Sequence, residues 1–287
     1  MVRIVYVNGS YLPYPKATIH AEDRGFQFAD AVYEVCEVRN SNLVDLTRHL
    51  TRLHRSLKEL QMVPPMSDAA LRLVIGEVLR GNLVINGLVY LPVTRGAAPR
   101  DFVFPFKKVK PTLVVLARSL DPLKLKAKAE AGISVTSVPD VRWKRCDLKT
   151  VMLLPAVLAK EDAQKRGAQE AWFVDEKGFV TEGGSSNAWI VLKNGTVVTR
   201  HLDNHILGGV TRSTVLDVLM SLGLKLQERA FSLSEAHGAI EAFVTSASAT
   251  VMPVVKLDGQ QIGTGKPGSI TCSLREKFHA KAEMTPF

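Results

Sequence analysis

The 287-residue chain has little cysteine and no long apolar segment. Its three cysteines, Cys36, Cys146 and Cys272, are an odd number at wide spacing, which indicates neither a disulfide framework nor a paired zinc motif. The first residues contain no apolar signal core, and no stretch approaches the roughly 18 uninterrupted apolar residues of a transmembrane helix. We therefore expect a soluble protein of the reducing cytoplasm that has no membrane partner.

The chain also lacks the motifs of several common functions. The seven histidines form no His-Glu-x-x-His pair, so we expect no metal site. A Gly-x-Ser-x-Gly elbow is absent. Residues 263–267 (Gly-Thr-Gly-Lys-Pro) are similar to a phosphate loop, but Gln260 stands where its first glycine belongs and proline follows the lysine. The net charge of +9 comes from scattered residues without an RNA-binding motif, so we expect no nucleic-acid partner.

The pattern of apolar residues predicts a mixed α/β (α+β) protein with two domains. Loss of periodicity around Asp121 predicts a linker at 119–126, between a small domain at 1–118 and a larger one at 127–287. Leucines that recur at spacings of 4, 3, 4 and 3 indicate a helix with one buried face at 46–60. The other expected helices are 67–80, 153–166, 210–222 and 269–282. The expected strands are 2–8, 31–38, 88–94, 112–117, 133–138, 171–174, 188–192, 197–199, 242–245 and 254–257.

Lys149 is the first candidate for chemistry. A single lysine is ordinarily a solvated charge, but the apolar residues 151–154 follow this one directly. A lysine at the edge of a buried segment loses hydration, which lowers its pKa and makes its amine nucleophilic. Lys149 therefore fits the requirement for a lysine that forms a Schiff base.

Two glycine-containing segments suggest a cofactor site. Glu182 is followed by two glycines and two serines, where a planar cofactor could approach a carboxylate closely. A polar loop between two strands is the ordinary interpretation, and alone this signal is weak. Residues 207–212 (Leu-Gly-Gly-Val-Thr-Arg) lead straight into a predicted helix. The unpaired N–H groups of its first turn, with the Thr211 hydroxyl, suit a phosphate, although a simple turn before a helix carries about half the weight.

Arginines on two other segments suit anionic groups. Arg48, Arg52 and Arg55 lie off the leucine face of the helix at 46–60, and one of them could reach a phosphate. Arg95 and Arg100 lie in a loop after a predicted strand, where an arginine could bind a substrate carboxylate.

Taken together, these segments resemble the class IV, fold-type IV aminotransferases that use pyridoxal 5′-phosphate, and most closely the D-amino-acid aminotransferases. The resemblance extends over nearly the whole chain, from residues 23–26 (Asp-Arg-Gly-Phe) to the last predicted helix. Its most specific segments are 32–35, 142–149, 181–187 and 207–212. It implies a small N-terminal α/β domain and a larger, β-barrel-like C-terminal domain with flanking helices.

The resemblance implies a role for each matched residue. Lys149 is the catalytic residue, which bonds to the cofactor aldehyde and moves the proton, and Glu182 pairs with the pyridine nitrogen. Arg52 holds the phosphate. The remaining cofactor contacts are Leu207 on the ring face, and Gly209, Val210, Thr211, Ser246 and Ala247 around the phosphate. Ala247 stands where the family usually has a hydroxyl, so one side-chain hydrogen bond is lost there.

The match is looser on the substrate side. In D-amino-acid aminotransferases an arginine, a histidine and a tyrosine bind the α-carboxylate, and Arg100 and Tyr33 match two of these residues. Phe102 occupies the histidine position, where the lost partner costs about 1–3 kcal/mol. Ser248 is the remaining expected substrate contact.

The implied reaction moves the amino group of a D-amino acid to a 2-oxo acid such as 2-oxoglutarate or pyruvate, in a homodimer. The alternatives that the sequence leaves open are an (R)-selective amine transaminase, to which Phe102 adds weight, a branched-chain L-amino-acid aminotransferase, an aminodeoxychorismate lyase, and an inactive protein that only binds a small molecule.

Overall fold

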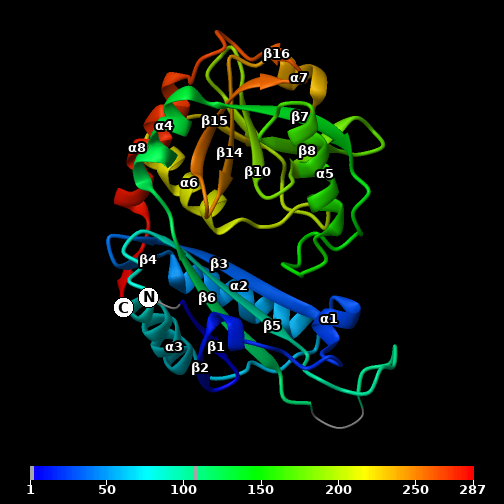
Figure 1. The fold of residues 1–287 in the computed structure, drawn as a ribbon. Helices are drawn as coiled ribbons and strands as arrows, with labels where there is room; N and C mark the ends of the chain where they lie inside the picture. Colours follow the sequence, from blue (N-terminus) through cyan, green and yellow to red (C-terminus); the bar gives the residue numbers. More distant parts are fainter. Residues whose placement is uncertain (1–2, 106–108) are drawn as a thin grey trace. The chain divides into compact units, whose positions relative to one another are not determined.

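The structure is a computed structural model that describes residues 3–105 and 109–287 (Figure 1). The chain folds into two compact units. The first comprises Met1–Asp121, Leu148–Met152 and Glu283–Phe287, and the second comprises Pro122–Asp147 and Leu153–Ala282. Two short pieces from late in the chain therefore belong to the first unit, although the sequence pattern placed both in the C-terminal domain.

The described strands of the first unit form one antiparallel sheet in the order β17-β4-β3-β5-β6-β1-β2. Its elements are β1 (Ile4–Val7), β2 (Ser10–Pro13), η1 (Tyr14–Lys16), α1 (Arg24–Phe28), β3 (Ala31–Arg39), β4 (Asn42–Val44), α2 (Leu46–Glu59), α3 (Asp68–Gly81), β5 (Gly87–Thr94), β6 (Thr112–Ser119) and β17 (Met284–Pro286). Strand β3 pairs with β5 from Ala31 to Val38, so it is a rigid base for the side chains that it carries.

The two long helices of this unit form where their sequences predict them. The leucine face of α2 is buried, with Leu50, Leu53 and Leu57 each at most 3% exposed, and the helix packs against β3. The Ser67 hydroxyl caps α3 by accepting a hydrogen bond of 3.3 Å from the Ala70 amide. Both predicted helices are confirmed.

The second unit is built on a larger sheet, whose described strands run in the order β12-β11-β10-β14-β15-β7-β8-β9-β13, with β16 beside β15. Its elements are α4 (Pro122–Ala131), β7 (Ile133–Pro139), α5 (Leu154–Lys165), β8 (Glu170–Val174), β9 (Phe179–Gly183), β10 (Asn187–Val191), β11 (Val197–Thr199), α6 (Val210–Ser221), β12 (Leu226–Glu228), β13 (Phe231–Ser232), α7 (Leu233–His237), β14 (Glu241–Ser246), β15 (Thr250–Leu257), β16 (Gln260–Gln261) and α8 (Ser269–Lys281).

This second sheet curls like half a barrel (Figure 1). It combines antiparallel pairs with the parallel pairs β15–β7, β7–β8 and β11–β12. Six large aromatic side chains are fully buried among the described residues of this unit: Trp172, Phe173, Trp189, Phe231, Phe243 and Phe278. The expected fold class, with its small α/β unit and larger barrel-like unit, is confirmed.

Helix α4 occupies much of the segment that we expected to be an irregular linker. Pro122 suits the first turn of a helix, where its missing N–H is not needed, and lysines and alanines favour the turns that follow. The helix has little apolar periodicity because it buries only Ala129. No described helix is both long and apolar enough to cross a membrane.

Candidate functional site

Lys149 is held against strand β3 by its own backbone. The Tyr33 amide donates to the Lys149 carbonyl at 2.9 Å, and the Val151 amide donates to the Ala31 carbonyl at 3.2 Å. The Lys149 Nζ atom lies 4.3 Å from the centre of the Tyr33 ring, which itself packs edge-on against Tyr90. The structure therefore brings Lys149 and Tyr33 together, with the amine resting on an aromatic face.

Arg52, on helix α2, forms a buried ion pair with Glu34 on strand β3. Its Nε and Nη2 atoms donate to the two Glu34 oxygens at 2.8 and 2.6 Å, and the His49 Nδ1 atom lies 2.7 Å from Glu34 Oε2. Burial raises the pKa of Glu34, but the charge and hydrogen bonds of Arg52, together with His49, lower it from 4.5 to about 2. Burial lowers the pKa of His49 despite the bond to Glu34. Because Glu34 is ionised, His49 is the donor of this bond, and the Arg52 guanidinium is locked in one orientation.

Arg100 and Phe102 lie together in the loop after β5. The Arg100 guanidinium is 5.2 Å from the centre of the Phe28 ring and 5.5 Å from that of Phe102, which is 79% exposed. Arg95 is used differently, because its side chain donates to both Asp30 oxygens at 2.7 and 3.0 Å. Of the two arginines in this loop, Arg100 is therefore the one exposed to solvent.

In the second unit, Glu182 is a buried carboxylate surrounded by donors. It is 6% exposed, and its Oε2 atom accepts hydrogen bonds from Asn187 Nδ2 at 3.1 Å and from the Leu207 amide at 3.0 Å. Its Oε1 atom accepts from Arg142 Nη1. Three donors thus fix the direction of the carboxylate and favour its ionised form.

The glycine turn before α6 packs against the same Asn187 side chain. Asn187 Nδ2 donates to the Leu207 carbonyl at 2.9 Å, and a Cβ atom on Gly209 would come within 2.2 Å of Asn187 Oδ1. A side chain at this position would therefore displace the Asn187 amide. Helix α6 then begins at Val210, and no side chain caps the N–H groups of its first turn. Thr211 follows within that turn and is buried.

Strand β14 brings the remaining predicted residues to this region. It pairs with β10 so that Asn187 lies opposite Thr245, and α6 packs against it. Ser246 ends the strand and Ala247 follows, while the Ser246 and Ser248 hydroxyl oxygens are 3.3 Å apart. In the second unit, Glu182, the turn before α6 and the end of β14 therefore all lie near Asn187.

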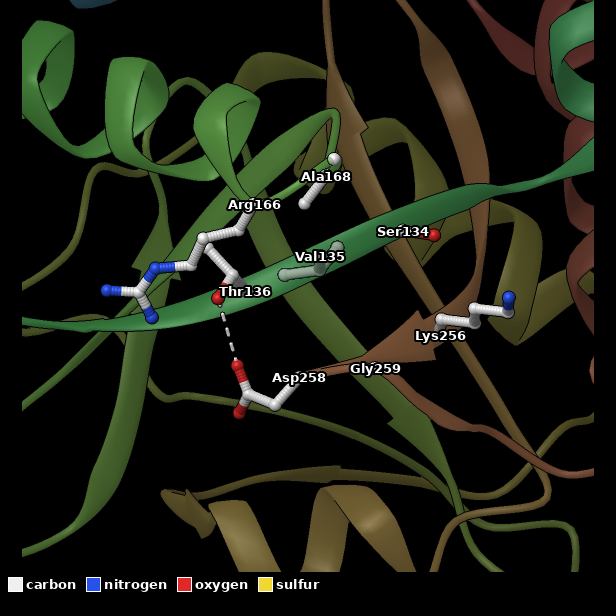
Figure 2. Close-up of a pocket in the computed structure, with 9 residues that line it drawn as sticks. Ser134, Val135, Thr136, Arg166, Ala168, Lys256, Asp258 and Gly259 are labelled. Carbon is white, nitrogen blue, oxygen red and sulfur yellow. Dashed lines mark hydrogen bonds between the residues drawn. The ribbon is translucent and has the colours of Figure 1, made fainter.

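The second unit also contains a pocket of about 460 Å³. Figure 2 shows the side chains that line it. Its walls come from β7, the turn after α5 and the turn after β15. Asp258 within it accepts a hydrogen bond of 3.1 Å from the Thr136 hydroxyl. None of the predicted site residues lines this pocket.

Several residues that shape these groups were not singled out from the sequence. Glu34 alternates with Val32 and Cys36, and all three side chains are buried, so period-two alternation could have marked it as a buried charge. His49 lies one helical turn from Arg52, which was the available signal for its part in the cluster. Asp140 and Asn187 each have one partner nearby in sequence, Arg142 two residues and Glu182 five residues away. Their other contacts, with Thr181 and the Leu207 carbonyl, join residues 41 and 20 apart, and these gave no signal in the sequence.

Two solved structures show that this fold is known. A branched-chain amino acid aminotransferase from Escherichia coli superposes with a TM-score of 0.88 at 22% identity, covering 98% of this chain and 94% of that one. A hypothetical aminotransferase from Mycobacterium tuberculosis, in its PLP-bound form, gives a TM-score of 0.82 at 20% identity, covering 96% of this chain and 98% of that one. These likenesses define the fold.

The sequence comparisons define the family. Residues 31–257 match the amino-transferase class IV family. A D-alanine aminotransferase from Staphylococcus haemolyticus is 38% identical over 97% of this chain and 98% of its own, and one from Bacillus licheniformis is 37% identical over 93% of each. The chain belongs to the class IV aminotransferase family, as its resemblance implied.

Proposed function

We propose that this aminotransferase uses pyridoxal 5′-phosphate to transfer the amino group of a D-amino acid to a 2-oxo acid such as 2-oxoglutarate or pyruvate. The observation that carries the proposal is Glu182, a buried carboxylate that three donors hold in one direction. The D-alanine aminotransferases that match nearly the whole chain support the choice of substrate.

The residues of the chain suit the three polar parts of this cofactor. The aldehyde needs an amine, and Lys149 provides one. The ring nitrogen, which must stay protonated, needs a carboxylate, and Glu182 provides it. The phosphate suits the N–H groups at the start of α6. When bound, the cofactor supplies a ring that takes up the electron pair left as the α-proton departs.

Lys149 would hold the cofactor through its aldehyde, and its amine, when free, would take the proton from the donor α-carbon. Its backbone bonds to β3 fix the point from which the side chain extends, and the Tyr33 ring limits where the amine can lie. The same amine would also serve as the acid that returns this proton. Return of the amino group to the 2-oxo acid follows the same steps in reverse, so ping-pong kinetics follow.

The phosphate is bound by backbone and side chain together. The amides of Val210 and Thr211, with the Thr211 hydroxyl, would donate to it, and Gly209 would allow it to come close. Ser246 and Ala247 would contact it through their backbone, and Leu207 would support the ring face. Arg52 would supply the charge, with its guanidinium oriented by Glu34.

The donor carboxylate is bound by Tyr33 and Arg100, with Ser248 as a further contact. Phe102, which is 79% exposed, cannot replace the histidine of related D-specific enzymes as a hydrogen-bond donor. We infer that Arg100 provides most of the binding to the donor carboxylate. The affinity for amino acids is then weaker, but the preference for the D-enantiomer is unchanged.

We also propose that the protein works in the cytoplasm as a homodimer. The three thiols are all free, which suits a reducing compartment. Helix α5 has an exposed apolar face formed by Leu154, Val157 and Leu158, each at least 59% exposed, which is the kind of surface that a second copy covers. Sedimentation analysis that finds only monomers at micromolar concentration would contradict the dimer.

The assigned lysine is tested by trapping. Borohydride reduction of the protein with bound cofactor should attach the cofactor to Lys149, as shown by mass spectrometry of the peptides. The Lys149→Ala variant should carry no label, and Lys144→Ala, which removes an exposed lysine nearby, should be labelled like the natural protein. Label retained in Lys149→Ala would overturn the assignment.

The proposed substrate is tested by steady-state rates with 2-oxoglutarate or pyruvate as acceptor. D-alanine and D-glutamate should act as donors. L-leucine should give at most a small fraction of their rate, and the opposite order would show that the branched-chain L-specific alternative is correct.

A further inference from the structure

Glu182 belongs to a row of three charged side chains, in which Arg142 lies between Glu182 and Asp140. Arg142 donates one hydrogen bond to Glu182 through Nη1 and two to Asp140, from Nε at 2.9 Å and from Nη2 at 2.7 Å. The Thr181 hydroxyl donates to Asp140 at 2.7 Å. Two carboxylates therefore share one guanidinium, and Asp140 has the larger share.

The guanidinium has almost no freedom to move. Arg142 Nη2 also donates to the His205 carbonyl at 3.0 Å, and its guanidinium carbon is 4.3 Å from the centre of the Phe173 ring. Its side chain is 12% exposed and that of Asp140 10%. A planar fork fixed on several sides sets the direction of any carboxylate that it binds.

Charges alternate along this row. Burial alone would lower the pKa of Arg142, but its hydrogen bond to Asp140 and the charge of Glu182 raise this pKa above its usual value. The guanidinium is therefore always charged. Burial raises the pKa of Asp140, but the hydrogen bonds and charge of Arg142 lower it below its usual value. The nearby Cys146 thiol is neutral, because burial raises its pKa to about 12.

The alternation has a consequence for Glu182. A lone guanidinium against a carboxylate weakens the affinity of that carboxylate for a proton, and it also repels a protonated ring beyond it. Asp140 neutralises most of the guanidinium charge through its two bonds. Glu182 then keeps its orientation without losing its basicity.

We propose that Asp140 and Arg142 are positioning residues for the cofactor: Arg142 directs the Glu182 carboxylate, and Asp140 balances the charge so that Glu182 keeps a proton on the ring nitrogen. The inference rests on the proposed role of Glu182. Neither residue touches the reacting atoms, and both act through the carboxylate.

The two parts of the proposal are separated by two variants. Asp140→Asn keeps the shape of the side chain and an acceptor oxygen, but it leaves the Arg142 charge unbalanced. Arg142→Lys keeps a positive charge but loses the fork that spans both carboxylates. Asp175→Asn is the matched control, because it removes a carboxylate paired with Arg200 at 3.2 Å in the same unit without touching Glu182.

The test uses the holoenzyme reconstituted with pyridoxal phosphate labelled with ¹⁵N in the ring. In the natural protein the NMR shift should show a protonated nitrogen. Asp140→Asn should shift the signal toward the unprotonated form and lower kcat about 10- to 100-fold, with the KM for D-alanine within about twofold of the natural value. Arg142→Lys should weaken cofactor binding about tenfold, measured by fluorescence titration.

Each outcome decides a separate point. Natural-like ¹⁵N shifts and kcat in Asp140→Asn would overturn the charge-balancing role, and natural-like cofactor affinity in Arg142→Lys would overturn the orienting role. An Asp175→Asn control that changes as much as Asp140→Asn would show that loss of any buried ion pair suffices, which also overturns the proposal. A natural protein whose ring nitrogen is unprotonated would instead refute the role of Glu182 itself.

Discussion

The buried ion pair between Glu34 and Arg52 should make the protein less stable at low pH, and the Glu34→Gln variant tests this dependence. Glu34 is 1% exposed and accepts hydrogen bonds from both Arg52 and His49. The Glu34→Gln variant keeps the size of the side chain but removes its charge. The Arg52 guanidinium then remains in a buried site without its counter-charge.

The magnitude follows from the pKa of Glu34, which is lowered from 4.5 to about 2 in the folded state. A difference of this size is worth about 3 kcal/mol of unfolding free energy. Because the folded pKa is the lower one, the stabilisation is complete above about pH 5 and disappears as the pH falls toward 2. About 2 kcal/mol should be lost by pH 3.

Urea unfolding of the natural protein and of Glu34→Gln at several pH values measures this effect. At pH 7 the variant should be less stable by about 3–5 kcal/mol, because one partner of a buried ion pair is missing. The gap should narrow by about 2 kcal/mol at pH 3. Glu37→Gln removes a carboxylate from the same strand without breaking the Arg52 pair, and it serves as the control. A Glu34→Gln gap that is independent of pH would refute the reasoning.

Three further substitutions test the site and the fold. Gly209→Ala places a Cβ atom within 2.2 Å of Asn187 Oδ1, so it should displace a donor of Glu182 and weaken cofactor binding about tenfold in a fluorescence titration; unchanged affinity would contradict the packing. Phe102→His should restore a carboxylate donor and lower the KM for D-alanine about 5- to 100-fold, while an amine without a carboxylate gains nothing; equal effects on both donors would exclude carboxylate recognition. Ser67→Ala removes the cap of α3, so the unfolding free energy should fall by about 1 kcal/mol with kcat unchanged, and a loss of activity at full stability would contradict a purely structural role.

The elements that could be predicted from the sequence are those whose signals are local. The leucine spacing of α2, the Ser67 cap of α3 and the glycine that precedes α6 each lie within a few residues of the structure that they specify. The short strand β4 and the C-terminal strand β17 have three residues each, too few to show a period. They form because residues 42–44 pair with the C-terminal residues 284–286, and the Asp45 amide donates to the Glu283 carbonyl beside that pair.

In the candidate site too, the residues with local signals could be predicted and the contacts between them could not. Lys149 and Glu182 could be singled out because their neighbours are unusual in sequence. The backbone pairing that fixes Lys149 on β3 joins residues far apart in the chain. The Asn187 side chain joins Glu182, five residues away, to the Leu207 carbonyl, 20 residues away. No period or spacing in the sequence reports such contacts, so they emerge only from the folded structure.

The central claim is that the protein accepts amino groups from D-amino acids, and the half-reaction tests it most directly. The protein with bound cofactor is mixed with one donor at a time, without any 2-oxo acid, and the visible absorbance of the cofactor is followed. D-alanine and D-glutamate should bleach the yellow colour, and L-leucine should leave it unchanged. Bleaching by L-leucine, with no change on adding either D-amino acid, would contradict the account.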